Sequence, residues 1–159
     1  MTEKETRPSW DEYFSNLAII IGGRGTCDRG HCGAIVVKDR RIVSTGYAGS
    51  PVGCLHCDEI GHEMNTVIHE DGSKSDHCIR TTHAEQNAIC QAARFGAAIE
   101  GGTIYVKMAP CYTCAKMIIN AGIKRVVCNQ DYHASARSKE IFKEAGVEFV
   151  LLDEEIVKY

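Results

Sequence analysis

The sequence lacks any apolar run long enough to cross a membrane. A spanning helix needs about 18 or more consecutive apolar residues, and the longest candidate here, Leu17–Ile21, is far shorter. The N-terminal segment, residues 1–7, mixes acidic and basic side chains and has no apolar stretch of the kind that a signal peptide carries. These two absences predict a cytoplasmic protein that has no membrane partner.

The sequence also lacks an excess of positive charge. Its net charge is −3, so charge alone does not indicate a nucleic-acid-binding face, although a few local Arg or Lys side chains could still bind a nucleotide. Apolar residues make up 44% of the chain, which excludes a disordered composition. A length of 159 residues suits one domain with a hydrophobic core. We therefore predict a single domain over residues 1–159 and no nucleic-acid partner.

Cysteine and histidine, by contrast, are abundant. The chain has nine cysteines and seven histidines, and many of them crowd into a few places. Disulfide scaffolds are typical of exported chains with even cysteine counts, whereas this count is odd and no export signal is visible. The composition therefore favours metal ligation over disulfide bonding.

Apolar side chains at helical spacing predict a first helix that begins after Ser9 and packs on a sheet. Glu12 follows Ser9 by three residues, which is the pattern of a capping box. The stripe that this helix is expected to bury consists of Trp10, Tyr13, Phe14, Leu17 and Ile21.

The rest of the chain reads as a hairpin followed by alternating helices and strands. Two apolar runs separated by a polar turn predict an antiparallel pair, and the later alternation predicts parallel crossovers. The expected fold class is α/β, with one five-stranded mixed sheet and helices on both faces. The expected strands are 34–37, 42–47, 103–107, 124–128 and 147–152, and the later helices are 83–95, 111–121 and 134–145.

Residues 48–80 show no periodicity and are predicted to form a long irregular insertion. A loop of this length in a compact domain is usually functional or disordered. The many cysteines and histidines in this insertion favour a loop that is held in place by a bound metal. Its polar part, residues 65–76, is expected to be mobile. The ligand-type residues of this insertion are Cys54, His56, Cys57, His62, His69, His77 and Cys78.

Three residues outside this insertion have the spacing of a catalytic zinc site. Such a site has three protein ligands and one open position for water, and His83, Cys111 and Cys114 would supply the three. Cysteines three apart on a first helical turn share one face, and the helix N-terminus stabilises their thiolates. His83 is also expected at a helix start. The alternative is a structural zinc that takes a further residue as its fourth ligand.

Glu85 lies two residues past His83, close to the expected metal without needing to bind it. His-Xaa-Glu together with Pro-Cys-Xaa-Xaa-Cys is the signature of the zinc-dependent nucleobase deaminases, in which this Glu is the general acid and base. Zinc can lower the pKa of its water to about 7. Glu85 would take a proton from that water, pass it to a ring nitrogen and protonate the leaving ammonia.

Six stretches carry a resemblance to one enzyme family: Gly33–Val37, Thr45–Tyr47, His56–Glu59, His77–Ala88, Pro110–Lys116 and Ala121–Lys124. Through them nearly the whole chain resembles the deoxycytidylate (dCMP) deaminases of the cytidine deaminase-like superfamily. The resemblance implies a three-layer α/β/α fold, the conversion of dCMP to dUMP and ammonia, and a hexamer. It also implies a nucleotide substrate, with activation by dCTP and Mg²⁺ and inhibition by dTTP in many members.

The resemblance further implies a second zinc, with ligands that match Cys27, Cys57 and His77. We take Cys78 as the fourth ligand, although adjacent residues such as His77 and Cys78 are awkward co-ligands and one of them could point elsewhere. The alternative is that these are merely buried or exposed thiols. Further candidates are Cys54, His56 and His62, whereas Cys32, Cys90 and Cys128 are interpreted as core residues.

One position departs from the family pattern. Ala48 stands in Gly46-Tyr47-Ala48-Gly49 where the family has an Asn that contacts the sugar side of the nucleotide, and its side chain cannot form a hydrogen bond. The departure bears on the sugar and phosphate preference more than on the chemistry. Candidates for substrate contacts are Ala48, Ser50, Asn87 and a loop residue, Tyr132, and those for phosphate are Arg24, Arg29 and Lys116.

Two further positions are candidates for allosteric control. Arg94 matches an arginine that the family uses in allosteric switching. Gly25 belongs to a glycine-rich turn whose backbone N–H groups could cradle a phosphate, although the turn has no Walker-type Lys and is better explained by the end of a helix. Three rival functions stay open: a deaminase of CMP, a free nucleoside or a modified base; a catalytically silent zinc module; and an RNA-editing deaminase, which the net acidity disfavours.

Overall fold

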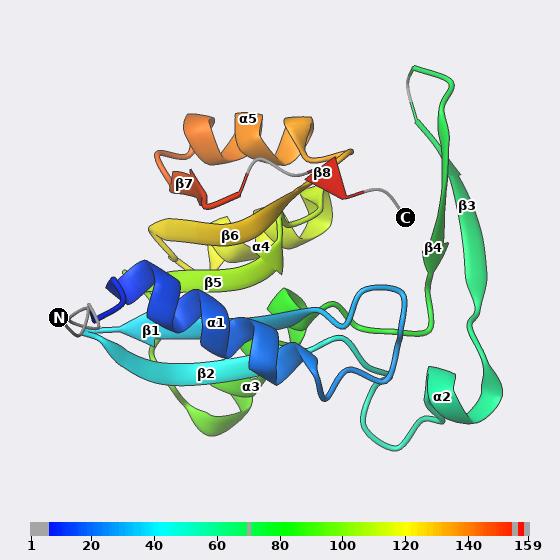
Figure 1. The fold of residues 1–159 in the computed structure, drawn as a ribbon, viewed down its shortest axis with the longest axis horizontal. Helices are drawn as coiled ribbons and strands as arrows, with labels where there is room; N and C mark the ends of the chain where they lie inside the picture. The colour runs from blue at the N-terminus through cyan, green and yellow to red at the C-terminus, as the bar shows by residue number, and fades with distance from the viewer. Residues whose placement is uncertain (1–6, 70, 154–155, 158–159) are drawn as a thin grey trace, which may run out of the picture.

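A mixed sheet with the strand order β2-β1-β5-β6-β7 forms the centre of the protein (Figure 1). The computed structural model describes residues 7–69, 71–153 and 156–157. β1 pairs antiparallel with β2, and β5, β6 and β7 run parallel, as predicted. β1 also pairs antiparallel with β5. The strands are β1 (Gly33–Lys38), β2 (Arg41–Tyr47), β5 (Thr103–Met108), β6 (Arg125–Tyr132) and β7 (Glu148–Leu151).

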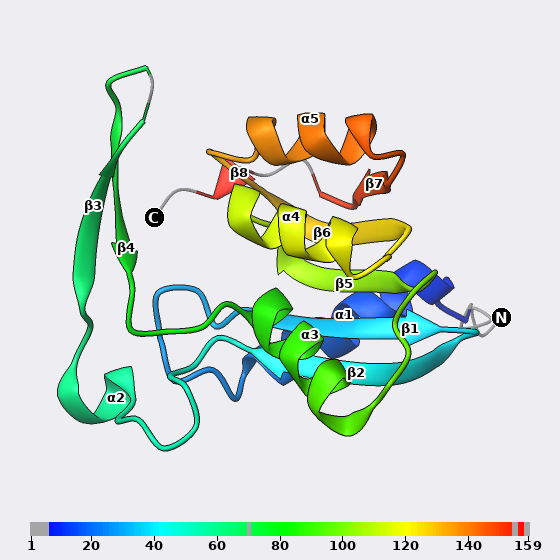
Figure 2. The ribbon, with the colours of Figure 1, turned by 180° about the vertical axis from the view of Figure 1, so that it is seen from behind.

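Helices cover both faces of this sheet, which confirms the three-layer α/β/α fold (Figures 1 and 2). Alternate residues of β1 point to opposite faces. Ile35 packs in the core with α1, whereas Ala34 packs in the core with α3, α4 and α5. The helices are α1 (Trp10–Gly22), α3 (Ala84–Phe95), α4 (Tyr112–Asn120) and α5 (Ala136–Glu144).

None of the helices within the described ranges combines the length and the apolar character that crossing a lipid bilayer requires.

Small residues bring α3 close to the sheet. Ala84 and Ala88 on α3 are buried, and both face β2 at Gly46. A Cβ atom at Gly46 would lie 2.2 Å from the Ala84 carbonyl oxygen and 2.4 Å from the Ala88 nitrogen, so this close packing requires glycine. The contact fixes the N-terminal end of α3, which is where His83 lies.

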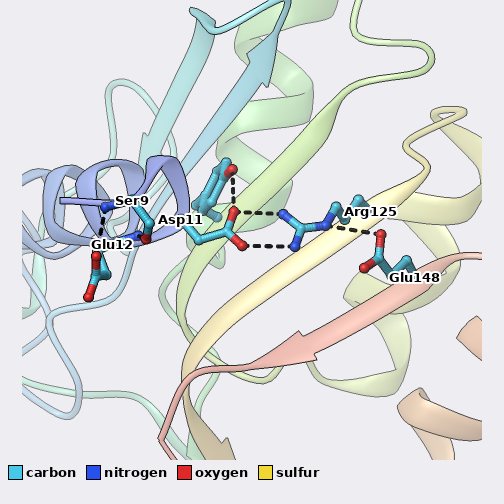
Figure 3. A network of polar contacts seen from close by, with 6 residues as sticks. Ser9, Asp11, Glu12, Arg125 and Glu148 are labelled. Carbon is cyan, nitrogen blue, oxygen red and sulfur yellow. Dashed lines mark hydrogen bonds and ion pairs between the residues drawn. The ribbon is translucent and has the colours of Figure 1, made fainter. Parts of the chain in front are cut away.

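A network of hydrogen bonds and ion pairs connects α1 to the sheet at the start of β6 (Figure 3). Arg125 on β6 donates two hydrogen bonds to the carboxylate of Asp11, at 2.7 and 2.8 Å, and a third to Glu148 at 3.0 Å. The hydroxyl of Tyr105 also donates to Asp11, at 2.9 Å. The predicted capping box at the start of α1 is present, because Ser9 and Glu12 exchange hydrogen bonds.

The predicted buried stripe of α1 is only partly correct. Phe14 is buried, but Trp10 and Tyr13 are 50% and 45% exposed. The reason is that Asp11 turns toward the sheet to reach Arg125, which leaves Trp10 at the rim, where its ring stacks on Phe14. The small residue Ala18 is also buried on the face of α1 that packs against the sheet.

The prediction of an irregular loop over residues 48–80 was wrong in part. This insertion contains a short helix α2 (Cys57–Ile60) and an antiparallel hairpin of β3 (Met64–Ile68) and β4 (Lys74–Cys78) that extends away from the sheet (Figures 1 and 2). Every residue of β3 is exposed, so its sequence carries no apolar alternation by which the strand could be recognised. A short strand β8 (Ile156–Val157), which pairs with β6, was also not predicted.

Candidate active site

Two helix N-termini bring three ligand-type side chains together beside the sheet. His83 is the N-cap residue of α3 and Cys111 is the N-cap residue of α4, with Cys114 one turn further on. The Nδ1 atom of His83 lies 3.6 Å from the Sγ atom of Cys111 and 3.4 Å from that of Cys114. The ligand atoms of all three residues lie within 4.8 Å of one another.

This geometry fits a tetrahedral zinc. Bond lengths of about 2.3 Å to sulfur and about 2.0 Å to nitrogen place two tetrahedral ligand atoms about 3.6 Å apart. The observed distances between His83 and the two sulfur atoms agree with that separation. The N–H groups of the two helix starts also favour negative charge at the cluster. Three donors of this kind leave a fourth position for water, as a catalytic zinc requires.

The electrostatics of the cluster prepare Cys111 for a metal, whereas His83 and Cys114 would have to lose a proton on binding it. Hydrogen bonds from Cys114 and from His83 lower the pKa of Cys111 to about 4, so its sulfur is a thiolate at neutral pH. The same contact with Cys111 raises the pKa of His83 to about 9. The Cys114 pKa is raised, chiefly by the adjacent Cys111. A ready thiolate is the form in which cysteine binds zinc.

Glu85 lies in the first turn of α3 and is only 7% exposed. Burial raises the pKa of its carboxyl group, although the positive charge of His83 opposes this shift. A carboxyl whose pKa is raised takes up a proton more readily than a free carboxyl does, which is the property that a general acid and base needs.

One pocket opens over the cluster. His83, Cys111 and Glu85 form part of its wall, and the wall also includes two of the predicted substrate-binding residues, Ala48 and Tyr132. The remaining wall comes from the loop before β1 and the first residue of β1, from β4, from the start of α3 and from the end of β5. These residues are Cys27, Arg29, Gly30, His31, Cys32, Gly33, Asp76, His77, Cys78, Thr81, Ala84, Met108 and Ala109.

Tyr132 is the last residue of β6, whereas the sequence analysis placed it in a loop. It is buried, and the Asp131 carboxylate before it accepts hydrogen bonds from the Tyr132 amide, from Ser135 and from Lys139. The carboxyl ends of parallel strands are where ligands collect in open α/β sheets. The longer strand therefore fixes Tyr132 in the pocket wall more firmly than a loop would.

The other two predicted substrate residues lie outside this pocket. Asn87 donates a hydrogen bond from its side-chain amide to the Tyr47 carbonyl oxygen, at 2.7 Å, and so ties α3 to the end of β2. Asn87 and Ser50 both line a second hollow along β2 and α3. Neither side chain lines the pocket wall that includes Ala48.

The predicted allosteric residues also lie outside the pocket over the cluster. Arg94 is exposed near the end of α3, with its guanidinium 5.7 Å from the centre of the Phe95 ring. Gly25 lies in the turn after α1, where its amide donates to the Gly22 carbonyl oxygen. Among the predicted phosphate partners, only Arg29 lines the pocket, while Arg24 and Lys116 are exposed.

A second group of ligand-type side chains lies at the base of the hairpin. It consists of Cys27, Cys57, His62 and Cys78, with all four ligand atoms within 4.8 Å of one another. The Cys27 Sγ atom lies 3.6 Å from the His62 Nδ1 atom, and the sulfur atoms of Cys57 and Cys78 are also 3.6 Å apart. The carboxylate of Asp28 lies 2.9 Å from the other ring nitrogen of His62.

The cluster differs from the predicted set in one residue, since His62 replaces His77. His77 and Cys78 are consecutive residues of β4, and consecutive strand residues point to opposite faces. Only one of the two can reach the cluster, and the other, His77, lines the pocket instead. His62 follows Cys57 by five residues, just after the short helix α2. A prediction of that helix would have favoured His62 over His77 as the histidine of this cluster.

Burial works against ionisation of Cys78, but backbone N–H groups of Glu63 and Arg80 outweigh it and lower the Cys78 pKa to about 6. This second cluster therefore also contains a thiol that ionises easily, as a metal site requires. The two remaining candidates do not join it. His56 contacts Thr26 through its Nδ1 atom at 2.9 Å, and Cys54 is exposed.

The three cysteines that were predicted as core residues have different environments. Cys128 is fully buried in the sheet, as predicted. Cys32 is half-buried and lines the pocket, and Cys90 is exposed on α3, so the prediction was wrong for Cys90. The period of a helix places one residue in every turn toward solvent, and a small apolar residue such as cysteine is tolerated there.

The fold and the site together define an α/β protein with a three-ligand metal centre, a buried carboxylate and an open pocket. The sequence matches the family described as the cytidine and deoxycytidylate deaminase zinc-binding region over residues 8–130. The chain belongs to this family, whose signature residues are those that line the metal centre.

Relatives and solved structures agree with that membership. The chain is 43% identical to ComE operon protein 2 of Bacillus subtilis over 153 residues, which are 95% of this chain and 76% of that protein. It is 38% identical to the deoxycytidylate deaminase of Mycobacterium phage D29 over 125 residues, 77% of this chain and 95% of that one.

Among solved structures, the dCMP deaminase of cyanophage S-TIM5 in complex with dCMP and dUMP superposes with a TM-score of 0.74. It is 30% identical in sequence, and the match covers 92% of this chain and 99% of that chain. The fold is therefore that of a dCMP deaminase over nearly its full length.

Proposed function

We propose that this protein catalyses the hydrolytic deamination of dCMP to dUMP and ammonia. The observation that carries the proposal is the arrangement of His83, Cys111 and Cys114 around one point, with the buried Glu85 beside them in the wall of an open pocket. The family match and the relatives named as deoxycytidylate deaminases support the same chemistry.

The ligand set would supply one part of the mechanism. His83, Cys111 and Cys114 would hold zinc, which when bound activates a water for attack on C4 of the cytosine ring. Glu85 performs the proton transfers. It would take the first proton that the water releases and deliver it to the ring nitrogen next to C4. It would then take the second proton, from the hydroxyl formed on C4, and pass it to the amino group as the bond from C4 to nitrogen breaks and ammonia leaves.

The rest of the wall positions the base. Tyr132 and Ala84 supply apolar surface beside Glu85. The backbone of Ala48 is already engaged, because its amide donates to the Cys32 carbonyl oxygen and its own carbonyl accepts from Thr26. Position 48 thus offers the nucleotide only a methyl group. Polar contacts with the sugar and phosphate therefore have to come from other parts of the pocket.

A panel of substrates tests this proposal. Ammonia release would be measured with dCMP, CMP, deoxycytidine, cytidine and dCTP, each with and without dCTP or dTTP as an effector. We expect dCMP to have the highest kcat/KM. Preference for CMP or a free nucleoside would contradict the substrate assignment, and no turnover with any of them would favour a silent zinc module.

We also propose that Cys27, Cys57, His62 and Cys78 bind a second, structural zinc. Four ligands complete a tetrahedral shell and leave no open position, which is the arrangement of structural rather than catalytic zinc. The contact of His62 with the Asp28 carboxylate supports the assignment, because histidines that bind metals usually donate their other ring N–H to such a group. Metal analysis should then give two zinc ions per chain, and a value near one would contradict the proposal.

Regulation and assembly form a further part of the proposal. Activation by dCTP with Mg²⁺, inhibition by dTTP, a hexamer and a cytoplasmic location remain predictions from the sequence. The exposed Arg94 and the apolar ring of Phe95, 74% exposed at the end of the same helix, support a contact surface there. Light scattering of the purified protein tests the hexamer, and a monomer would contradict it.

A further inference from the structure

The end of β6 extends beyond the register of both strands beside it. The pairing of β5 with β6 ends at Gln130, and the pairing of β7 with β6 ends at Cys128. Tyr132 lies further on, is only 7% exposed and lines the pocket. The main sheet therefore does not by itself hold the backbone of Tyr132, and its ring depends on other contacts to keep its place in the pocket wall.

The carboxylate of Asp131 supplies these contacts. Its Oδ1 atom accepts hydrogen bonds from the Tyr132 amide at 2.8 Å and from the Ser135 hydroxyl at 2.6 Å. Its Oδ2 atom accepts a hydrogen bond from the Lys139 Nζ atom, at 2.6 Å. The Ser135 amide in turn donates to the Tyr132 carbonyl oxygen, at 2.9 Å. Both backbone polar groups of Tyr132 are thus engaged within one turn.

The partners of Asp131 belong to the start of α5, so this turn joins the end of β6 to a helix. Ser135 is the N-cap residue of α5, and Lys139 lies one turn further along it. The ion pair is partly shielded from water, because the side chains of Asp131 and Lys139 are 14% and 36% exposed. Burial works against ionisation of Asp131, but the hydrogen bonds from Lys139, Ser135 and the Tyr132 amide outweigh it and lower the Asp131 pKa. A negative charge here also suits the N-terminus of α5.

β8 supports the same two residues from another side. It pairs in parallel with the end of β6, with Ile156 opposite Asp131 and Val157 opposite Tyr132 (Figures 1 and 2). These pairs hold the backbone, whereas the Asp131 carboxylate also fixes the turn that follows. The backbone of Tyr132 is therefore held between a short strand and a helix start.

The side chain of Tyr132 lies close to the reaction centre. Tyr132 belongs to the same packed core as Ala84 at the start of α3, and both residues line the pocket. Burial and the nearby Cys111 raise the pKa of Tyr132. The side chain is therefore a neutral phenol at neutral pH. A flat, uncharged ring of this kind is suited to contact with a nucleobase.

We propose that Asp131, held by Ser135 and Lys139, is a positioning residue that keeps the ring of Tyr132 in place against the base of the substrate. This inference rests on the proposed function, because it assumes that the cytosine ring lies in the pocket at Glu85. Asp131 does not line that pocket, so it acts on the substrate only through Tyr132. A side chain contributes fully to binding and orientation only when its own position is fixed.

A double-mutant cycle tests this dependence. Isothermal titration calorimetry would measure the Kd of dUMP for the unaltered protein, Asp131→Ala, Tyr132→Leu and the double variant. Asp131→Ala should weaken dUMP by about 10-fold, the lower end of what hydrogen bonds to a charged group contribute. Tyr132→Leu, which keeps an apolar side chain in the core, should weaken it at least as much. In the Tyr132→Leu background, Asp131→Ala should have no further effect, because the ring that it holds is gone.

Equal effects of Asp131→Ala in the two backgrounds would overturn the inference, since a general loss of stability does not depend on the Tyr132 ring. Asp131→Asn is the conservative variant. Its carbonyl oxygen still accepts from the Tyr132 amide and from Ser135 while its charge is lost, so its dUMP affinity should lie between those of the unaltered protein and Asp131→Ala.

Steady-state kinetics with dCMP separates positioning from loss of folded protein. In Asp131→Ala the KM should rise while kcat stays within about 2-fold, because the ring contacts the base before and during the reaction and Glu85 is untouched. Partly unfolded protein would instead lower kcat and the calorimetric stoichiometry at unchanged KM and Kd. That result would contradict a positioning role.

Lys143→Met is the matched control for Lys139→Met, because Lys143 is exposed one turn further along α5. Lys139→Met should raise the KM for dCMP, and Lys143→Met should leave it unchanged. The same KM in both lysine variants would remove Lys139 from the proposed arrangement.

Failure of this inference can be told apart from failure of the proposed function. Turnover of dCMP by the unaltered protein, together with equal effects of Asp131→Ala in the two backgrounds, would overturn only the positioning role. No turnover of any cytosine compound would overturn the proposed function, and the calorimetric cycle would still decide whether Asp131 acts through Tyr132.

Discussion

At the scale of single residues, the contact between Asp28 and His62 is the clearest support for the proposed second metal site. The carboxylate lies 2.9 Å from the Nε2 atom of His62, and the Nδ1 atom of the same ring faces the Cys27 sulfur. This contact holds the ring so that Nδ1 is free for a metal. The imidazole of His62 is thus oriented from its far side by a residue that does not bind the metal.

Asp28→Asn should therefore weaken zinc at the second site by about 10- to 100-fold, the usual effect of losing a group behind a metal-bound histidine. Competition with a chromophoric chelator measures the affinity of each site. The catalytic site should be unchanged, and Asp58→Asn, which alters an exposed acid on nearby α2, serves as the control. Equal zinc affinity in the Asp28 variant and the control would contradict the assigned role.

The residues of the main site could be predicted because their geometry is local. His83 and Glu85 share the first turn of one helix, as do Cys111 and Cys114 with another, so the spacing alone brings each pair together. The second cluster could not be predicted completely. The choice between His62 and His77 depends on the alternation of β4, a strand whose polar sequence gave no sign of it.

At the scale of elements, α1 is held to the sheet by charge as well as by apolar packing. Asp11 accepts two hydrogen bonds from Arg125 and a third from Tyr105 (Figure 3). The Arg125 guanidinium holds the pKa of Asp11 below its usual 3.8, with burial acting in the opposite direction. A depressed folded-state pKa stabilises the fold above the unfolded value, and this contribution is lost as the pH falls through the lower folded value.

Asp11→Asn should accordingly lower the free energy of unfolding at pH 7 by about 1 kcal/mol, since the pair is partly exposed to solvent. The difference from the unaltered protein should shrink as the pH falls below about 4, because the native carboxylate is then also neutralised. Urea denaturation at several pH values measures this. Glu140→Gln, on the exposed face of α5, is the control, and a pH-independent difference would contradict the account.

Elements were predictable where an apolar face had to be buried. β1 and α3 each show this pattern, and both were found close to the expected ranges. The hairpin of β3 and β4 buries little, so its stability depends on the cluster at its base and on backbone pairing, neither of which leaves a pattern in the sequence. In the proposed second site, ligands that are distant in sequence would take the place of an apolar core.

At the scale of the whole molecule, the predicted effector response would connect α3 to other copies of the chain. α3 begins at the metal ligand His83 and ends beside the exposed Arg94 and Phe95, so one rigid helix joins the active site to the surface. A ligand bound at the far end could bias the position of His83 only through this helix or its packing on β2.

Arg94→Ala should reduce the activation by dCTP while leaving turnover in the absence of effector largely unchanged, because Arg94 does not line the pocket. The ratio of kcat/KM for dCMP with and without dCTP and Mg²⁺ measures this. Arg41→Ala, an exposed cation on β2, is the control. An unchanged dCTP response in the Arg94 variant would contradict the assignment.

In the proposed mechanism Glu85 moves the protons, while His83, Cys111 and Cys114 hold the metal. Measuring dCMP turnover and zinc content together in Glu85→Gln separates these two roles. We expect the same zinc content as in the unaltered protein and a loss of kcat of at least about 100-fold, as when a general acid and base is removed. Near-normal turnover with zinc retained would contradict the mechanism.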